Sequence, residues 1–226
     1  MSAHPLDNMV WNALAGPQAA LGVSNGRARR FDPDIGVFAA VENPLESLDG
    51  LAEIIPDGGR VGLVTTGPLT LPPDLEALAM GEVVQLTAER FAPVVTTGVV
   101  YRDLTALDVP QMLDLVALTR PGPFGRRTIE MGHYIGVFDG GRLIAMTGER
   151  LRLDGFGEVS AVCTHPDYQG RGIAKALVSV IGSEIVARGE VPFLQAYTSN
   201  AAAIATYRRL GFVPRRDLTF TTIKRR

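Results

Sequence analysis

A glycine-rich turn in the last third of the chain is the part of this sequence whose residues most clearly indicate chemistry. Residues 162–175 read VCTHPDYQGRGIAK, an apolar run followed by a loop with two glycines and then by a helical pattern. Glycine lets a backbone approach a ligand closely, and the first N–H groups of a helix point toward negative charge. The order therefore predicts an anion site, for which a phosphate is the natural ligand.

The composition limits which partners this site can serve. Of the 226 residues, 46% are hydrophobic, enough for the core of one large or two small globular domains. Lys and Arg number 22 and Asp and Glu number 24, so the net charge of −2 gives no general attraction to nucleic acid or to an acidic membrane. We expect neither as a partner.

The cysteine, the histidines and the apolar runs further limit the cellular compartment and the cofactors that we expect. The single Cys163 allows no disulfide within the chain, and three scattered histidines make no zinc pattern. Asp7 precedes any long apolar stretch, and no apolar run approaches the roughly 18 residues of a membrane span. We therefore expect a cytoplasmic protein without a bound metal.

The elements that must position the turn show clear periodicity from about residue 99 onward. We expect strands at 133–139, 142–150, 158–164 and 192–197, helices at 107–119, 169–187 and 200–210, and a final strand pair within 212–223. Hairpin turns join the early strands, and a strand, helix, strand crossover follows. The prediction is a mixed, mostly antiparallel central sheet flanked by helices, of the α/β (α+β) class.

Residues 1–98 are expected to form an N-terminal α/β domain, and residues 99–226 the domain that carries the turn. In the first part, turn residues separate short apolar segments. The expected strands are 37–41, 60–66 and 82–87, and the expected helices are 45–54 and 73–80. No second anion turn occurs there, and Trp11, the only tryptophan, is expected to anchor the core.

The turn and the helix that follows it together resemble a known family. Gln169, Gly172 and Ala174 match the Gln/Arg-x-x-Gly-x-Gly/Ala signature of the GNAT superfamily of acyl-CoA-dependent N-acyltransferases. Asn200 and the segment 207–212, which reads YRRLGF, match a later helix of its FR47-like and glycine N-acyltransferase-like branch. The resemblance covers about residues 99–226, and residues 1–98 would then be a truncated copy without a cofactor site.

The resemblance implies acetyl-CoA, or another acyl-CoA, as a co-substrate. Backbone N–H groups of the turn would hold the CoA pyrophosphate, the preceding strand would hold the pantetheine arm, and Asn200 would contact CoA. A strand N–H, that of Val162 or Cys163, would polarise the thioester. The implied cofactor-binding residues are Val162, Cys163, Thr164, Gln169, Gly170, Arg171, Gly172, Ile173, Ala174, Lys175 and Asn200.

The resemblance also implies an acid and a base. Tyr207 matches the tyrosine that protonates the departing thiolate, although it could equally be a packed aromatic side chain. A base helps because an alkyl amine is mostly protonated at neutral pH. Glu158 is the leading base, because family members that use a glutamate in this strand hold it at about this spacing before the turn; a solvated strand charge is the alternative. Alternation places Glu158 on the same face as Val162 but about 13 Å away, so its proton would pass through water. Glu149 is the second candidate and His133 the third.

The acceptor side of the predicted site is less defined. The family shapes its acceptor pocket with the first helix and the loop after it, here 121–127, where Phe124 could wall the pocket and Arg126 or Arg127 could bind a carboxylate. A solvated loop is the alternative for the arginines. We expect a small-molecule amine or an amino acid as acceptor, and leave a protein amine and a homodimer open. Cys163 inside an apolar strand is expected to be a buried small side chain rather than a nucleophile.

Three functions therefore compete. The first is an N-acyltransferase that works by direct attack of the amine on the thioester. The second is a non-catalytic acyl-CoA-binding module, which would need neither Glu158 nor Tyr207. The third, a dinucleotide-binding domain, fits less well because the Gly-x-Gly-x-x-Gly order is absent.

Overall fold

The computed structural model describes residues 4–95 and 98–226, so residues 1–3, 96 and 97 of the expected first domain lie outside the described residues. The strands are β1 (Gly22–Ser24), β2 (Ala28–Phe31), β3 (Ala39–Val41), β4 (Val61–Thr65), β5 (Leu75–Thr87), β6 (Arg102–Asp103), β7 (Tyr134–Asp139), β8 (Arg142–Leu153), β9 (Phe156–Thr164), β10 (Val191–Tyr197) and β11 (Val213–Arg225). The α-helices are α1 (Met9–Ala15), α2 (Leu51–Ile54), α3 (Val109–Thr119), α4 (Ile173–Ala187) and α5 (Ala201–Arg208).

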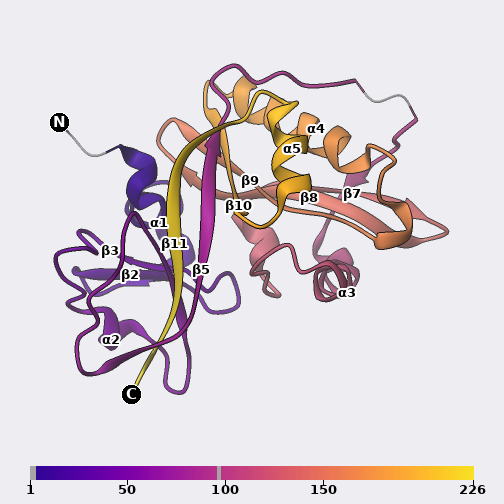
Figure 1. The fold of residues 1–226 in the computed structure, drawn as a ribbon. Coiled ribbons are helices and arrows are strands. Elements are labelled where there is room, and N and C mark those ends of the chain that lie inside the picture. The colour runs from indigo at the N-terminus through magenta and orange to yellow at the C-terminus, as the bar shows by residue number, and fades with distance from the viewer. Residues whose placement is uncertain (1–3, 96–97) are drawn as a thin grey trace.

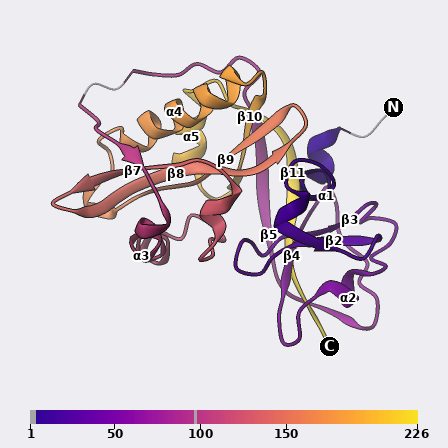
Figure 2. The ribbon, with the colours of Figure 1, turned by 180° about the vertical axis from the view of Figure 1, so that it is seen from behind.

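A large sheet of order β4-β11-β5-β10-β9-β8-β7-β6 forms the body of the structure, and β1, β2 and β3 form a small second sheet (Figure 1). The pairing of β9 with β10 is parallel, and every other neighbouring pair of strands in the large sheet is antiparallel. Helices α4 and α5 cover one face and α3 the other, as both views show (Figure 2). The expected fold class, a mixed sheet flanked by helices, is confirmed.

Helix α4 is held on the sheet by a continuous apolar stripe. Leu177, Val178, Ile181 and Ile185 have no exposed surface, and they share a core cluster with side chains of the central strands. Their spacing follows the helical repeat, so one face of α4 is buried along its whole length. Burial of each such side chain contributes on the order of 2 kcal/mol, which fixes the position of the helix and of the turn before it.

The large sheet crosses the expected boundary at residue 98. Strand β5 pairs with β10 over five residues, from Phe193 opposite Thr87 to Tyr197 opposite Val83. On its other edge β5 pairs with β11, which also pairs with β4. The first 98 residues therefore contribute two strands to the same sheet, and the division into 1–98 and 99–226 stays a prediction about separate folding units.

Three expected elements differ from those in the structure. Residues 73–80 are not a helix, because β5 begins at Leu75, and the helix expected at 45–54 is reduced to α2. The final strand pair is one long strand, β11. Segment 75–80 reads LEALAM, which is rich in helix formers, but pairing with the whole length of β11 outweighs that propensity.

A β-bulge in β9 changes which residues share a face. Gly148 pairs with Ser160 and Met146 with Cys163, so β9 contains one residue more than β8 across this interval. Ala161 has φ of 52°, the left-handed region that a residue with a Cβ seldom adopts. The expectation that Glu158 and Val162 lie on one face was wrong, because the extra residue reverses the alternation between them.

Strands β9 and β10 then separate. They pair only where Phe156, Gly157 and Glu158 lie opposite Val191, Pro192 and Phe193. Beyond Glu158 the edge of β9 that faces β10 carries no strand partner among the described residues. This opening in the middle of the sheet is the position of the candidate site. Among the described residues, no helix combines the length and apolar character needed to cross a membrane.

Candidate active site

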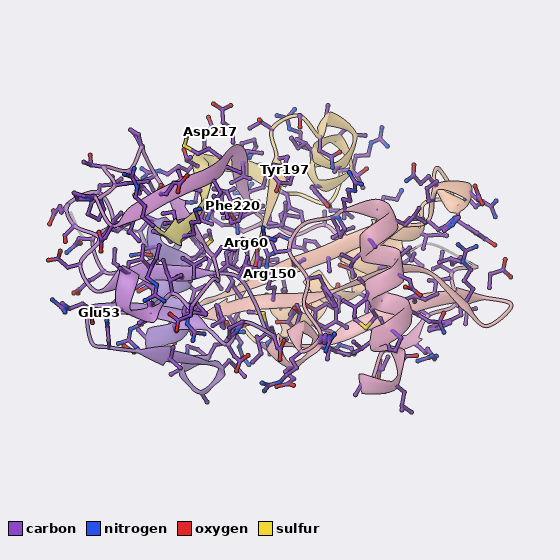
Figure 3. All side chains as sticks on the ribbon, turned by 90° about the horizontal axis from the view of Figure 1, so that it is seen from below. Glu53, Arg60, Arg150, Tyr197, Asp217 and Phe220 are labelled. Carbon is purple, nitrogen blue, oxygen red and sulfur yellow. The ribbon has the colours of Figure 1, made fainter. Side chains whose placement is uncertain are left out.

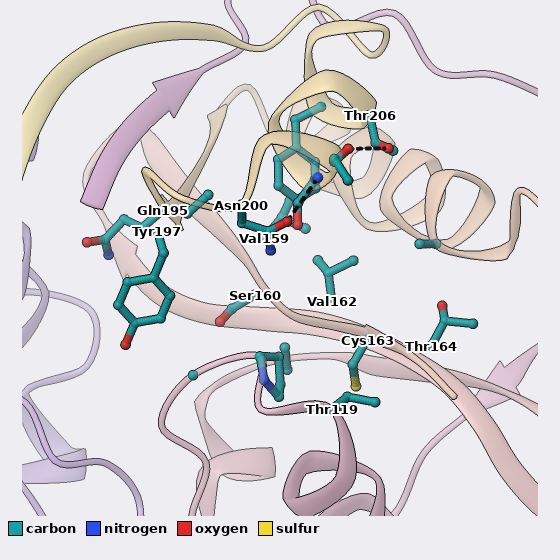
Figure 4. Close-up of a pocket in the computed structure, with 18 of the residues that line it drawn as sticks. Thr119, Val159, Ser160, Val162, Cys163, Thr164, Gln195, Tyr197, Asn200 and Thr206 are labelled. Atoms are coloured by element: carbon teal, nitrogen blue, oxygen red, sulfur yellow. Dashed lines mark hydrogen bonds between the residues drawn. The ribbon is translucent and has the colours of Figure 1, made fainter. Parts of the chain in front are cut away.

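One cavity of about 600 Å³ runs from the N-terminus of α4, past the open edge of β9, to strands of the N-terminal part (Figure 4). Its walls come from α3 and the loop after it, from β9, from the glycine-rich turn, and from β10 and α5. Ten of the eleven predicted cofactor residues line it, namely Val162, Cys163, Thr164, Gln169, Gly170, Gly172, Ile173, Ala174, Lys175 and Asn200.

The glycine-rich turn ends in an uncapped helix. Gly170 and Gly172 both have φ of 76°, and Gly172 is the N-cap of α4 without any side-chain cap hydrogen bond. The first backbone bond of the helix runs from the Ala176 N–H to the Gly172 carbonyl. The N–H groups of Ile173, Ala174 and Lys175 are therefore available to an anion, and the helix dipole favours negative charge there.

Arg171 is the exception among the predicted cofactor residues. Its guanidinium carbon lies 4.8 Å from the centre of the Tyr168 ring, and its Nη2 donates to the Asp167 carbonyl at 2.9 Å. Those two contacts hold it against the loop before the turn, outside the residues that line the cavity. Any contact of Arg171 with CoA phosphates needs a change of side-chain conformation.

The open edge of β9 presents hydrogen-bond donors to the cavity. The His165 N–H donates to the Ile144 carbonyl of β8 at 2.7 Å. Because successive N–H groups of a strand alternate in direction, those of Thr164 and Val162 face away from β8, toward the gap. The Thr164 hydroxyl is buried and has no hydrogen-bond partner among the described residues. An extended polar ligand such as a pantetheine arm fits donors arranged in this way.

Cys163 and Val162 point to opposite sides of β9. Figure 4 shows Val162 directed toward α5 and Cys163 directed toward Thr119 at the end of α3. Burial raises the pKa of the Cys163 thiol to about 12, so the thiol stays protonated near neutral pH. A thiol cannot act as a strong nucleophile in that form, which agrees with the expectation of a buried small side chain.

Tyr207 and Asn200 reach the cavity from α5. Tyr207 is only 7% exposed, packs edge-on against Phe212 at 6.1 Å between ring centres, and lines the cavity. Burial, with a smaller contribution from Cys163, raises the pKa of its phenol to about 12. The Asn200 side chain accepts a hydrogen bond from the Ala203 N–H at 3.2 Å and caps α5.

Glu158 lies beneath the cavity wall rather than in it. It is fully buried, and its two oxygens accept hydrogen bonds from Arg150 Nε and Nη2 at 2.9 and 2.8 Å. They also accept from Gln195 Nε2 at 2.9 Å and from the Leu151 N–H at 3.3 Å. Both oxygens are thus engaged by four donors and lie outside the cavity lining, so neither is placed to accept a proton from a ligand in the cavity.

The other predicted acceptor and base candidates are not brought to the cavity lining. Phe124 packs edge-on against Tyr134, and Arg126 lies exposed outside the lining. Glu149 forms a bidentate ion pair with Arg188 at 2.6 and 2.9 Å. His133 contacts Glu184 and Asp103, and Arg127 pairs with Glu130 and Asp32. Of the predicted acceptor loop, only 121–123 lines the cavity.

Sequence reasoning missed the far end of the cavity. Arg150, Tyr197 and Phe220, which are labelled near the middle of the molecule in Figure 3, line the cavity there. We call this end the acceptor chamber and define it by Phe38, Val64, Val83, Arg150, Gln195, Tyr197 and Phe220. Its members come from six different strands or loops, so no local pattern in the sequence marks them.

The charge of the lining is one-sided. Arg120, Arg150, Lys175 and Arg209 line the cavity, and no aspartate or glutamate among the described residues does. Such a cavity favours anionic ligands and offers no counter-charge to a cation. The described residues also contain no group of three or more His, Cys, Asp and Glu side chains placed to hold a metal ion.

Comparison with known proteins identifies the family. Residues 134–220 match the FR47-like protein family. The chain is 40% identical over 96 residues to the N-alpha-acetyltransferase RimI of Mycobacterium tuberculosis, spanning 41% of this chain and 60% of that protein. It is 37% identical over 82 residues to the mycothiol acetyltransferase of Mycobacterium avium, spanning 32% of this chain but only 26% of that protein.

The similarity to a solved structure extends over the whole chain. A GNAT-family protein from Novosphingobium aromaticivorans superposes with a TM-score of 0.92 at 40% identity, over 99% of this chain and 100% of that one. A GCN5-related N-acetyltransferase from Kribbella flavida shares the fold, with a TM-score of 0.61 at 13% identity over 96% of this chain and 92% of that one. The chain therefore belongs to the GNAT superfamily of N-acetyltransferases.

Proposed function

We propose that this protein transfers an acetyl group from acetyl-CoA to the primary amine of a small molecule by direct attack. The observation that carries the proposal is the single cavity that joins the N-terminus of α4, the open edge of β9 and Tyr207. An anion site, a row of backbone donors and a protonated phenol are the parts that thioester aminolysis requires.

The co-substrate would lie along contiguous backbone. Its pyrophosphate would accept hydrogen bonds from the N–H groups at the start of α4, with Lys175 and Arg209 adding positive charge. The pantetheine arm would run beside residues 162–164. Acetyl-CoA supplies an activated thioester, and the Val162 N–H would donate to its carbonyl oxygen as negative charge develops there.

The amine proton would leave through water. Glu158 is surrounded by four donors and lies outside the cavity lining, which contains no carboxylate among the described residues. The neutral amine nitrogen then attacks the thioester carbon and the C–S bond breaks. The nitrogen loses a second proton as the amide forms, and the thiolate takes up one proton to become the thiol. The products are the amide and free CoA thiol.

Tyr207 would stabilise the departing thiolate by donating a hydrogen bond. A thiol has a pKa near 8.5, whereas the phenol of Tyr207 has a pKa of about 12. Full proton transfer from the phenol would then be uphill by about 5 kcal/mol, at 1.36 kcal/mol per pKa unit. A hydrogen bond from a phenol that keeps its proton lowers the barrier without that cost.

The test is to incubate the protein with acetyl-CoA and a panel of amines and to follow free thiol. We expect thiol release that depends on the amine and acetylated product in equal amount. Tight CoA binding without thiol release from any amine, unchanged in Glu158→Gln and Tyr207→Phe, would instead favour a non-catalytic acyl-CoA-binding module.

A further inference from the structure

The acceptor chamber has an apolar wall contributed by strands on the N-terminal side of the sheet. Phe38 and Phe220 meet edge-on with 5.9 Å between their ring centres, and Val64 and Val83 line the cavity beside them. Phe220 lies on β11 between β4 and β5, so both neighbours of that strand come from the first 98 residues. The wall suits a ligand with an apolar body about the size of an aromatic ring.

Arg150 brings a fixed positive group to this wall. Its guanidinium carbon lies 4.7 Å from the centre of the Phe38 ring, and only 10% of its side chain is exposed. Nε and Nη2 are engaged by Glu158, but Nη1 forms no hydrogen bond with any described residue. A guanidinium has five N–H donors in two forks, so the fork formed by Nη1 and the second Nη2 hydrogen remains.

Glu158 and Gln195 determine the orientation of that fork. Gln195 donates to the same Glu158 oxygen that accepts from Arg150 Nη2, and the Leu151 N–H donates to the other oxygen. The carboxylate is thereby fixed between two strands, and it holds the guanidinium in one plane. Glu158 acts here as a positioning residue, which accounts for a carboxylate that is buried outside the cavity lining.

The charges of the chamber select against a purely cationic acceptor. No described carboxylate lines the cavity, and Glu158, which lies outside the lining, is already paired with Arg150. A second ammonium group on the ligand would lie near Arg150 without a counter-charge, which is costly in a partly desolvated site. A carboxylate on the ligand would instead meet the free fork of Arg150.

We infer that, if the transferase activity proposed above is correct, the acceptor is an amino acid with an apolar or aromatic side chain. Its carboxylate binds the free fork of Arg150, its side chain lies against Phe38 and Phe220, and its amine points toward the thioester site at Val162. The substrate class is thus set by side chains outside the local motif that binds CoA.

Matched acceptors test the inference on the unmodified protein. Thiol release from acetyl-CoA is measured with L-phenylalanine, L-phenylalaninamide, phenethylamine, L-alanine, spermidine and a peptide with a free N-terminus. We expect kcat/KM for L-phenylalanine to exceed that for the amide and for phenethylamine by about tenfold or more, the discrimination given by one charge-assisted contact. L-alanine is expected to be worse because it lacks the apolar body.

Arg150→Lys then identifies the group responsible. Removal of the charge would leave the buried Glu158 without its charged partner and endanger folding, whereas lysine keeps the charge but loses the second fork. We expect KM for L-phenylalanine to rise about tenfold, with kcat and the KM for phenethylamine changed less than about twofold. Arg152→Lys is the control, because Arg152 lies on the same strand and pairs with Glu190 outside the cavity lining.

Phe220→Leu tests the apolar wall in the same assay. We expect it to narrow the preference for L-phenylalanine over L-alanine by about threefold or more, because leucine retains bulk but presents less surface to an aromatic ligand. Phe138→Leu is the control, since Phe138 packs under Arg102 away from the cavity.

The outcomes separate the inference from the function on which it rests. Absence of thiol release with every amine contradicts the proposed function itself. Release with equal kcat/KM for L-phenylalanine and phenethylamine, or with spermidine or the peptide as the best acceptor, overturns the amino-acid acceptor alone. An Arg150→Lys protein that raises KM equally for L-phenylalanine and phenethylamine also overturns it.

Discussion

The two ends of the cavity are built in different ways. The CoA end consists of backbone N–H groups from one short stretch, 162–175, and of one face of α5. The acceptor chamber consists of side chains such as Phe38, Val83, Arg150 and Phe220, which are brought together only by the order of strands in the sheet. The comparison suggests that the two ends can change independently, since a mutation in one leaves the other's elements in place.

Gly172→Asp is the strongest test of the CoA end. Aspartate is among the residues found most often at a positive φ, which Gly172 has, and its charge would face the pyrophosphate at the start of α4. We expect the Kd for CoA to rise about a hundredfold or more, because charge-assisted hydrogen bonds to phosphate are replaced by repulsion. Isothermal titration calorimetry measures it.

Gly189→Asp is the matched control for that variant. Gly189 has φ of 78° and nothing within 4 Å of an added Cβ, but it follows the other end of α4. We expect less than a twofold change in the Kd for CoA. If the Kd of the Gly172→Asp protein for CoA lies within threefold of that of the unmodified protein, this turn is not the pyrophosphate site.

The same contrast explains what the sequence could predict. The glycine turn, Asn200 and Tyr207 all lie within residues 169–207 and match residue types of one family, so their common cavity could be anticipated. The central sheet followed from alternation and turns. The acceptor chamber could not be predicted, because Phe38, Val83 and Phe220 are ordinary apolar strand residues until the sheet order places them together.

The errors near Glu158 have a local physical origin. Strand alternation alone placed Glu158 on the face of Val162, and one extra residue at Ala161 reversed that relation. Sequence also gave no sign that Arg150, eight residues earlier, would pair with Glu158 across β8 and β9. A bulge is a tertiary feature here, since neither glycine nor proline marks it on β9 itself.

Tyr207→Phe tests the part of the cavity where the two ends meet, which is where the thioester is proposed to lie. The ring is retained and still packs against Phe212, so we expect the Kd for CoA to change less than twofold. We expect kcat to fall about 10- to 100-fold, at or below the lower end of general acid effects, because only a hydrogen bond to the thiolate is lost. Single-turnover thiol release measures it, and an unchanged kcat would leave Tyr207 as a packed aromatic side chain.

The pH profile of the unmodified protein sharpens the role of Tyr207. Burial raises the pKa of its phenol to about 12, so the phenol keeps its proton at any pH below that value. We therefore expect kcat to depend on pH in the same way in the unmodified protein and in Tyr207→Phe between pH 8 and pH 10. A fall in kcat over this range in the unmodified protein alone would mean that the phenol loses its proton at a much lower pH when substrates are bound.

His133→Gln should have the smallest effect, because His133 lies at neither end of the cavity. Partial burial opposes its protonation, but hydrogen bonds to Glu184 and Asp103 outweigh that effect and raise its pKa. A raised pKa means that the stabilisation is fully present below the unfolded value of about 6.5 and is lost as the pH rises through the folded value. The side chain is 37% exposed, so we expect the variant to lower the free energy of unfolding by less than ~1 kcal/mol at pH 5.5. Urea unfolding should show this difference shrinking toward zero at pH 8.5, while kcat changes less than twofold; a tenfold fall in kcat would instead restore His133 as the base.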